Sequence, residues 1–557
     1  MKRWLIITLI SFLLTLFVYP AAFRYPSDTL PDNNDTRLIA YIIGQVQQNL
    51  LKLQPLHYGT FFAPDQSTLA YSDLFLTSAA LTLPFRFLTH SPIIIFNIAL
   101  VLNFLLTIFA SFLLFEYLFK DLRTTSLAVL LFNFSGFHLH YLPHLQMFSM
   151  WLLCLSLYFF LRYLNENRPL FLTLFFAIVT LQLAESIFPV YLIFFATIII
   201  VIAIPPWREW QSIKIGINLN GSPRRVLLAM TKHSLPFIPL WLFLLFPYYQ
   251  LHTSLPEAIR PIRDAAHFSL GLDQIFTQFH SWTIITIFIL CGVVHVLSKI
   301  FDAAGALAKN RTDHVHRSRR ESRQRRDDIV TREYGFWRGP KRHIFNPWKY
   351  IFIFSIIMSL GPILKIFDSN LRLFGFPIPL PYALFYYLLP GFTGFRTPSR
   401  FIILALLATV VLIGFKLKPI FAELKTKTIV IFLLLILSLL FLEADLPLRG
   451  YPVNIHMHSV YQEVKNLPPD AVILELPIKL WNMPDHEIES IRSLYSLEHL
   501  HRRLGGFSGF ATNNWINLVN QINAKELSPT NIKALKSLGI THVIQNNQLF
   551  KLDSLSF

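Results

Sequence analysis

Long apolar runs constrain this chain more than any other feature. About 20 consecutive apolar residues are enough for a helix to cross the hydrocarbon core of a bilayer, and lipid offers no partners to unpaired backbone groups. Several runs here reach that length, and the composition agrees, because 54% of the 557 residues are hydrophobic and 53 are Phe. We therefore predict a polytopic helical membrane protein.

The length rule gives about eleven membrane-spanning helices. The first is expected over residues 4–22. Lys2 and Arg3 precede it as in a signal peptide, but Tyr19-Pro20-Ala21-Ala22-Phe23 is a poor cleavage site, which favours a retained anchor. The others are expected at 93–118, 124–139, 146–162, 169–185, 187–204, 234–251, 281–298, 348–367, 399–415 and 428–443.

The placement of Lys and Arg predicts the orientation, because short cytoplasmic loops are enriched in both. With the N-terminus inside, every inner loop is basic, namely 120–123, 162–168, 208–232, 299–349 and 416–427. A crossing at 71–90 would turn these loops outward, so that stretch is expected to be an interfacial helix. This orientation corresponds to a protein of the cytoplasmic membrane.

The net charge of +17 needs no nucleic acid as a partner. Much of it lies in the predicted cytoplasmic loop 299–349, where residues 314–343 hold about ten Arg and Lys without an apolar period. The loop is interpreted as a topology determinant that also touches membrane lipids; binding of anionic headgroups is the functional alternative.

The composition changes after the last apolar run. Residues 1–446 are expected to form the membrane domain, and 447–557 a small extracytoplasmic α/β domain. Residues 471–477 and 540–545 are predicted strands, and 528–539 is a predicted helix that Ser528 caps and Gly539 ends.

The first outer loop, residues 23–91, concentrates acidic residues in a chain whose helices are otherwise apolar. Channels and carriers usually carry ionisable residues or Gly and Pro breaks at mid-membrane, whereas the polar residues here gather at the outer ends of helices. A site at the membrane surface suits a substrate carried by a lipid. Candidates in this position are Asp35, His138, His140, His144, Glu185, Arg396 and Arg400.

The order of motifs resembles the GT-C superfamily of membrane glycosyltransferases. An apolar N-terminal helix is followed by an outer loop with an early Asp in "PDNNDTRLIAYIIGQ", by many crossings and by an external domain. Locally, "FFAPDQSTLAYSDLFL", "HLHYLPHLQMFSMWL", "PLPYALFYYLLPGFTGFRTPSRF", "VILELP" and "YSLEHLHRRLGGFSGF" resemble blocks of bacterial membrane proteins described as GT-C-like or YfhO-type. The resemblance covers nearly the whole chain, and it indicates the fold more firmly than the chemistry.

The resemblance implies transfer of a sugar from a polyprenyl-phosphate donor to an extracytoplasmic glycan or lipid, with inversion at the anomeric carbon. An acidic residue of the first outer loop would then be the general base or help to hold a metal, and Asp35 matches it. The neighbours are Asn33 and Asn34, where many members carry a second acid, and Asp32 is a weaker candidate. The alternative for Asp35 is that its side chain only caps a helix.

The other candidates have weaker patterns. Glu185 ends an apolar helix without a Lys or Arg nearby, which suits a second acid or metal ligand, or a residue that simply faces water. The spacing of the three His gives little support for zinc, so His140 and His144 are interpreted as sugar or phosphate contacts, or as interfacial side chains. Arg396 and Arg400 precede a helix on the outer side and suit a lipid phosphate; the alternative is snorkelling to the interface.

Two other function classes stay open at this level. One is a flippase or carrier of lipid-linked glycans, and the other is a non-enzymatic assembly protein of the cell envelope. No cofactor is fixed by the sequence, and a divalent cation such as Mg²⁺ or Mn²⁺ is an open alternative. The sequence names neither the sugar nor the acceptor.

Overall fold

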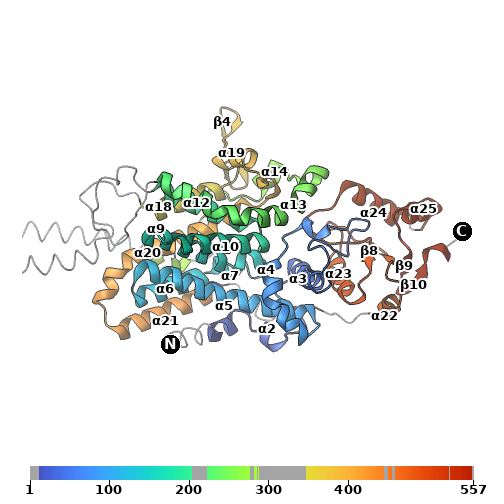
Figure 1. Ribbon diagram of the computed structural model, residues 1–557, viewed down its shortest axis with the longest axis horizontal. Helices are drawn as coiled ribbons and strands as arrows, with labels where there is room; N and C mark the ends of the chain where they lie inside the picture. The colour runs from blue at the N-terminus through green and yellow to red at the C-terminus, as the bar shows by residue number, and fades with distance from the viewer. Residues whose placement is uncertain are drawn as a thin grey trace, which may run out of the picture.

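The computed structural model describes residues 12–203, 223–275, 282–284, 286–287, 346–444, 450–453, 458–525 and 527–554. The described chain is mainly helical. Apolar helices fill one end of the long axis, the C-terminal strands and helices fill the other, and helix α3 (Asp35–Leu51) lies between them (Figure 1). The predicted spans at 4–22 and 281–298 lie partly, and the basic residues 314–343 wholly, outside the described residues.

Five helical stretches among the described residues are long and apolar enough to cross a membrane. They include α5 (Pro92–Phe119), α9 (Trp151–Glu166), α12 and α13 (Pro223–Ser234, Ile238–Ser254), α20 (Ile402–Glu423) and α21 (Thr426–Glu443). Three shorter apolar helices accompany them, namely α10 (Pro169–Glu185), α11 (Phe188–Ile202) and α18 (Pro347–Ser359). These helices support a multi-pass membrane protein. The number of eleven crossings stays a prediction.

Two predicted crossings differ from the structure. The run 124–139 is divided into α6 (Leu122–Asn133) and α7 (Gly136–His140), because Ser135 starts a new helix and its hydroxyl accepts the His138 N–H at 3.3 Å. The run 348–367 ends early, since α18 stops at Ser359 and the chain continues into the short strand β2 (Lys365–Ile366). Apolar composition marks both runs, but it does not show where the helix ends.

The stretch 71–90 is not one continuous interfacial helix. It contains the end of η1 (Thr68–Tyr71), then α4 (Leu76–Thr82) and η2 (Leu83–Phe87), with Pro84 in the first turn of η2. Seven helical residues rise about 10 Å, far less than the hydrocarbon core, so α4 does not cross a bilayer. Its Ala79 carbonyl accepts a hydrogen bond from Gln47 of α3.

The remaining short elements lie between the long helices. Next to the N-terminus are α2 (Ala21–Arg24) and β1 (Thr29–Leu30), and after α7 comes α8 (Leu145–Phe148). The others are η4 (Leu235–Phe237), η5 (Pro256–Ala258), α14 (Ile262–His267), β3 (Ser369–Asn370), β4 (Arg372–Leu373), β5 (Phe376–Pro377), α19 (Pro381–Leu388), η6 (Phe392–Gly394) and η7 (Pro398–Phe401).

The C-terminal segment, defined here as residues 450–554, is built around a four-stranded sheet of order β10-β9-β7-β8. Strand β7 is parallel to β8 and β9, while β9 and β10 are antiparallel. As expected, Ser528 caps α25 by accepting the Asn531 N–H. The elements are β6 (Tyr451–Pro452), α22 (Val460–Lys465), β7 (Val472–Glu475), α23 (Ile488–His499), β8 (Arg502–Arg503), α24 (Asn513–Lys525), α25 (Pro529–Ser537), β9 (His542–Gln545), β10 (Gln548–Lys551) and η8 (Leu552–Ser554).

Helix α3 joins this segment to the membrane helices. Residues 36–49 of α3 are buried, and the helix packs on both α5 and α23. Helices α3 and α23 come close at Gly44, where an added Cβ would lie only 2.7 Å from Leu497 Cδ1. The Gln48 side-chain amide also donates to the Leu497 carbonyl at 2.7 Å. The first residue of α3 is therefore held in a fixed place between the two parts.

A buried network of charges lies inside the C-terminal segment. The Arg503 guanidinium bonds Glu475 and Glu489, each at 2.5 Å, and Arg492 bonds Glu489 at 2.7 Å. Tyr461 donates its hydroxyl to Glu475 at 2.7 Å. Burial alone would raise the pKa of Glu475, but the neighbouring Arg503 and Arg492 hold it below the usual range. Every member of this network has a partner.

Candidate active site

A cavity of about 2230 Å³ lies where the membrane helices meet the C-terminal segment. Its lining includes the start of α3, residues 70–75, parts of α11 and α13, residues 257–268 and residues 389–400. The C-terminal segment contributes residues 479–483, His486 and 506–511, together with parts of α24. Five predicted site residues line this one cavity, namely Asp32, Asp35, His144, Arg396 and Arg400.

Asp35 is the first residue of α3, and helix capping does not occupy its side chain. The cap comes from Asp32, whose Oδ1 accepts the backbone N–H groups of Asn34 at 3.0 Å and Thr36 at 2.9 Å. The Thr36 hydroxyl donates to the same oxygen at 2.8 Å. Asp32 therefore satisfies two N–H groups at the start of the helix, as a capping carboxylate does. The carboxylate of Asp35 is left to face the cavity.

His144 is the partner of Asp35. Its Nε2 lies 3.1 Å from Asp35 Oδ2, and the two side chains are 32% and 49% exposed. Its other ring nitrogen, Nδ1, is buried and has no hydrogen-bond partner among the residues that the structure describes. The hydrogen bond from His144 lowers the pKa of Asp35 against the opposing effect of burial, and the charges of Arg400 and Arg396 add to the lowering. Asp35 is thus an ionised carboxylate that is still open to the cavity.

Arg396 and Arg400 come from the irregular segment between α19 and α20. Pro398 and Gly391 interrupt helical structure there, so the chain turns through η6 and η7 before α20 begins. Among the described residues, neither guanidinium has a hydrogen bond or an ion pair, and Arg400 Nε is buried without a partner. Arg396 lies over the ring of Phe268 at 5.4 Å. Arg396 is exposed and Arg400 is half-buried. Guanidinium donors that lie open at a cavity are suited to an anionic ligand.

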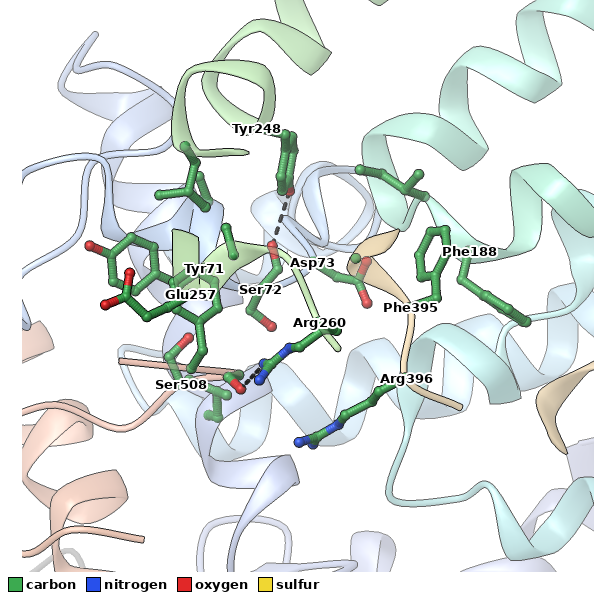
Figure 2. A pocket seen from close by; sticks show the side chains of 18 of the residues that line it. Tyr71, Ser72, Asp73, Phe188, Tyr248, Glu257, Arg260, Phe395, Arg396 and Ser508 are labelled. Atoms are coloured by element: carbon green, nitrogen blue, oxygen red, sulfur yellow. Dashed lines mark hydrogen bonds between the residues drawn. The ribbon is translucent and has the colours of Figure 1, made fainter. Parts of the chain in front are cut away.

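Arg260 adds a third cation. It follows η5, donates a hydrogen bond to the Gly509 carbonyl, and lies over the Phe510 ring at 5.4 Å. Figure 2 shows the side chains of Arg260 and Arg396 extending toward the same region of the cavity. Burial lowers the pKa of Arg260, and the charge of Arg396 lowers it further, which is the sign expected for two neighbouring cations.

Asp73 is the second carboxylate near these arginines. It lines the cavity and lies between Ser72 and Phe395 (Figure 2). Burial raises the pKa of Asp73, and contacts with Ser186, Arg400 and the Ile187 N–H offset part of that rise. The neighbouring Ser72 is fixed by Tyr248, whose hydroxyl donates to the Ser72 carbonyl at 3.1 Å.

Two predicted site residues lie elsewhere. Glu185 is only 1% exposed and does not line the cavity. Its two carboxylate oxygens accept the Ser78 N–H at 2.8 Å and the Ser78 hydroxyl at 2.5 Å, so it ties α10 to α4. His140 is exposed on α7 and is also absent from the lining. The ring of His138 is buried, with its nitrogens near the carbonyls of Asn133 and Phe148.

The described residues do not fit a preformed metal centre. They include no group of three His, Cys, Asp or Glu side chains spaced to hold an ion. Five carboxylates line the cavity, but Asp32 caps α3 and Asp35 already bonds His144; the other three are Asp73, Glu257 and Asp264. Divalent cations such as Mg²⁺ prefer several oxygen ligands, which this arrangement does not gather.

Sequence reasoning gave no functional role to Asp73 or Arg260. Asp73 follows Ser72 ahead of a short helix, a pattern that also fits a cap, yet the structure gives α4 no side-chain cap. The sequence does mark Arg260, because it lies on the predicted outer side, whereas Lys and Arg are enriched in cytoplasmic loops; Arg396 and Arg400 depart from this trend in the same way. The proximity of these residues to Asp35 could not be read from spacing.

No protein-family model and no curated protein matches the sequence. Among solved structures, this chain is similar to the oligosaccharyltransferase of Archaeoglobus fulgidus in complex with Zn and sulfate. The match covers 96% of this chain and 67% of that protein, with 12% identity and a TM-score of 0.48. ArnT from Cupriavidus metallidurans, bound to undecaprenyl phosphate, matches 98% of this chain over 92% of its own, with 11% identity and a TM-score of 0.41. Its apo structure gives a TM-score of 0.40.

At these identities and TM-scores, the solved structures assign no role to any residue of this chain.

Proposed function

We propose that this protein is a membrane glycosyltransferase that moves a sugar from a polyprenyl-phosphate donor to an extracytoplasmic acceptor. One observation supports this proposal above all. An ionised, half-exposed carboxylate at Asp35 lines the same cavity as Arg396 and Arg400, whose guanidinium groups make no hydrogen bond or ion pair among the described residues. A base and an anion-binding pair in one cavity are what transfer from a sugar phosphate requires.

The reaction is a single displacement. An acceptor hydroxyl attacks the anomeric carbon of the donor sugar while Asp35 takes the hydroxyl proton. A new glycosidic C–O bond forms, and the bond between the anomeric carbon and the phosphate oxygen breaks. The electron pair of that bond leaves on the lipid phosphate, and the configuration at the anomeric carbon is inverted.

Each charged residue has a separate part in this proposal. His144 keeps Asp35 oriented and ionised through the 3.1 Å contact. Arg396 and Arg400 bind the donor phosphate and stabilise the charge that grows on its oxygens as the bond breaks. Asp73 acts as a positioning residue, because its charge interacts with Arg400. No step requires a metal, since the arginines provide the positive charge.

The apolar side of the cavity suits the lipid part of the donor. Phe194 of α11 and Leu242, Leu245 and Phe246 of α13 line it. Leu242 and Phe246 are also 64% and 55% exposed at the surface of the helical bundle, where a membrane would surround them. The cavity therefore combines a lipid-facing wall with a polar reaction centre, on what we propose is the outer side of the cytoplasmic membrane.

The proposal is tested in cells that carry the Asp35→Asn variant at normal protein level. Mass spectrometry of extracted lipids and surface glycans should show that one glycan substituent is lost and that its polyprenyl-phosphate sugar accumulates. Accumulation is expected because the variant keeps the phosphate-binding arginines but has no base. Asp28→Asn is the matched control, since Asp28 is an exposed carboxylate in the same loop outside the cavity.

The same experiment separates transfer from the other function classes. A flippase that lacked Asp35 would leave the donor trapped on the inner leaflet, whereas a transferase leaves it on the outer leaflet. Treatment of intact cells with a membrane-impermeant reagent that oxidises sugar diols distinguishes the two. Unchanged glycans and lipids in the Asp35→Asn cells would show that the proposed enzyme is wrong. Glu185 and His140 stay predictions, and the structure gives them no contact with the cavity.

A further inference from the structure

The cavity wall changes in character from one end to the other. The wall formed by α11 and α13 is apolar, and the reaction centre is charged. The wall formed by the C-terminal segment combines aromatic rings with amides and one ammonium group, from Lys479, Trp481, Asn482, His486, Phe507 and Asn520. These six residues are called the outer ledge below. The mechanism proposed for the reaction uses none of them.

The aromatic members of the outer ledge differ in exposure, since Trp481 is open to solvent and His486 and Phe507 are half-buried. Trp481 is 75% exposed, although an indole of this size is usually well buried in a folded protein. His486 and Phe507 lie with their rings nearly parallel, at an interplanar angle of 19° and a centroid distance of 6.3 Å. The apolar C–H face of a sugar ring packs on such flat surfaces, and binding pockets commonly pair aromatic walls with a few polar groups.

The polar members complement this surface. Asn482 and Asn520 are exposed, and their side-chain amides make no hydrogen bond within the described part of the chain. An amide offers both donors and an acceptor, which matches a hydroxyl that also does both. Lys479 is partly buried, and no contact of its ammonium group is found among the described residues. Sugar hydroxyls satisfy all of these groups, whereas an acyl chain satisfies none.

The outer ledge is fixed relative to Asp35. The first outer loop pairs with the C-terminal segment, since Ala63 N–H donates to the Arg503 carbonyl at 3.0 Å and Phe62 N–H to the Gly505 carbonyl at 3.3 Å. Tyr71 and Phe510 stack with their centroids 4.6 Å apart. This packing explains Gly506, where an added Cβ would come within 2.7 Å of the Phe62 ring. These contacts hold the C-terminal segment, which carries the ledge, against the loop that leads from Asp35 to the cavity.

We propose that the outer ledge is the acceptor subsite and that the acceptor is a carbohydrate chain. The inference rests on the proposed function, and it narrows the acceptor from a glycan or lipid to a glycan. Trp481 and the His486–Phe507 pair pack against sugar rings, while Asn482, Asn520 and Lys479 bond hydroxyls or acidic groups of the same chain. The acceptor hydroxyl then reaches Asp35 within the cavity that both line.

Binding of polysaccharides tests this inference without any transfer reaction. The full chain in nanodiscs is applied to an array of neutral and acidic bacterial surface polysaccharides, with vesicles of anionic phospholipid as the lipid probe. Wild type should bind at least one polysaccharide, and Trp481→Ala should weaken that binding about tenfold, as loss of an aromatic anchor typically does. Trp481→Phe should restore most of the affinity, because a flat ring is kept.

Two matched variants complete the design. Ile488→Ala removes an apolar side chain that is 39% exposed in the same segment but outside the cavity, and it should bind as wild type does. Asp35→Asn should also bind normally, because the ledge does not include the base. Normal polysaccharide binding with no transfer would overturn the proposed function and leave the ledge standing. Two results would overturn the proposal that the ledge binds the acceptor. In one, transfer is unchanged in Trp481→Ala; in the other, the wild-type protein binds only the lipid vesicles or binds no probe.

Discussion

Two clusters of charge in this protein look alike in the sequence and differ in the structure. The network around Arg503 is buried, and every charge in it has a partner of opposite sign. The cluster around Asp35 is partly open, and among the described residues its arginines Arg396 and Arg400 make no hydrogen bond or ion pair. A completed network holds a fold together, whereas an incomplete one at a cavity is available to a ligand.

The difference can be seen in how each carboxylate is used. Glu475 bonds Arg503 and Tyr461, so its oxygens are committed. Among the described residues, the Asp35 carboxylate pairs with His144 alone, and its side chain is 49% exposed. The comparison predicts that substitutions in the first cluster change stability, and that substitutions in the second change binding or rate.

Arg503→Met should have the largest effect. It leaves Glu475 and Glu489 buried without Arg503, and breaking a buried ion pair typically costs about 3–5 kcal/mol. We expect a large fall in the melting temperature of the detergent-solubilised protein and faster proteolysis of the C-terminal segment. A melting temperature equal to that of wild type would mean that the network is not structural, and the comparison would fail.

Asp35→Asn should instead reduce transfer with little change in folding. General base catalysis contributes roughly 10²–10⁴-fold to rate, so transfer should fall within that range. The melting temperature should stay close to that of wild type, because partly exposed ion pairs contribute about 0–1 kcal/mol. If Asp35→Asn strongly destabilised the protein, the role of Asp35 would be structural, as that of Arg503 is.

Arg400→Gln should weaken binding of polyprenyl phosphate about 10- to 100-fold. A hydrogen bond to a charged group is worth about 1.5–3 kcal/mol, and each 1.4 kcal/mol is a factor of ten. Titration calorimetry of the protein with polyprenyl phosphate measures the change, with Arg24→Gln as an exposed control outside the cavity. Equal affinity in Arg400→Gln and wild type would remove Arg400 from the phosphate site.

The smallest expected effect is a shift in pH dependence. Asp35 works as a base only when ionised, and the His144 hydrogen bond lowers its pKa. The apparent pKa of the acid limb of the rate profile should therefore lie below the ordinary Asp value of about 3.9. His144→Gln removes the largest cause of that lowering, and the acid limb should move to higher pH. Transfer rates from pH 3 to 7 compare the two proteins; an unmoved acid limb would contradict the role of His144.

The Asp35–His144 contact should also make the stability of the fold depend on pH. A carboxylate whose pKa is lower in the folded state stabilises the fold above its unfolded pKa, and this contribution is lost as the pH falls through the folded pKa. His144→Gln should therefore reduce stability slightly at neutral pH and make no difference at strongly acidic pH.

Sequence patterns identified part of the candidate site because its residues have local signatures. Asp35 follows the start of an outer loop, and Arg396 and Arg400 oppose the charge trend, so each could be chosen without a structure. Glu185 had an equally good local signature, yet its carboxylate bonds Ser78, which is more than 100 residues away. A local pattern shows that a group is unusual, but not which distant group satisfies it.

The sequence by itself determined that this chain is a multi-pass helical membrane protein and where many of its helices lie, because hydrophobic length depends only on neighbours along the chain. Only the tertiary structure decided that Asp32 caps α3 and leaves Asp35 open, since both acids suit either role in sequence. It also brought Asp73, Arg260 and the outer ledge to one cavity. Such a cavity is made by packing between distant segments, which no local periodicity encodes.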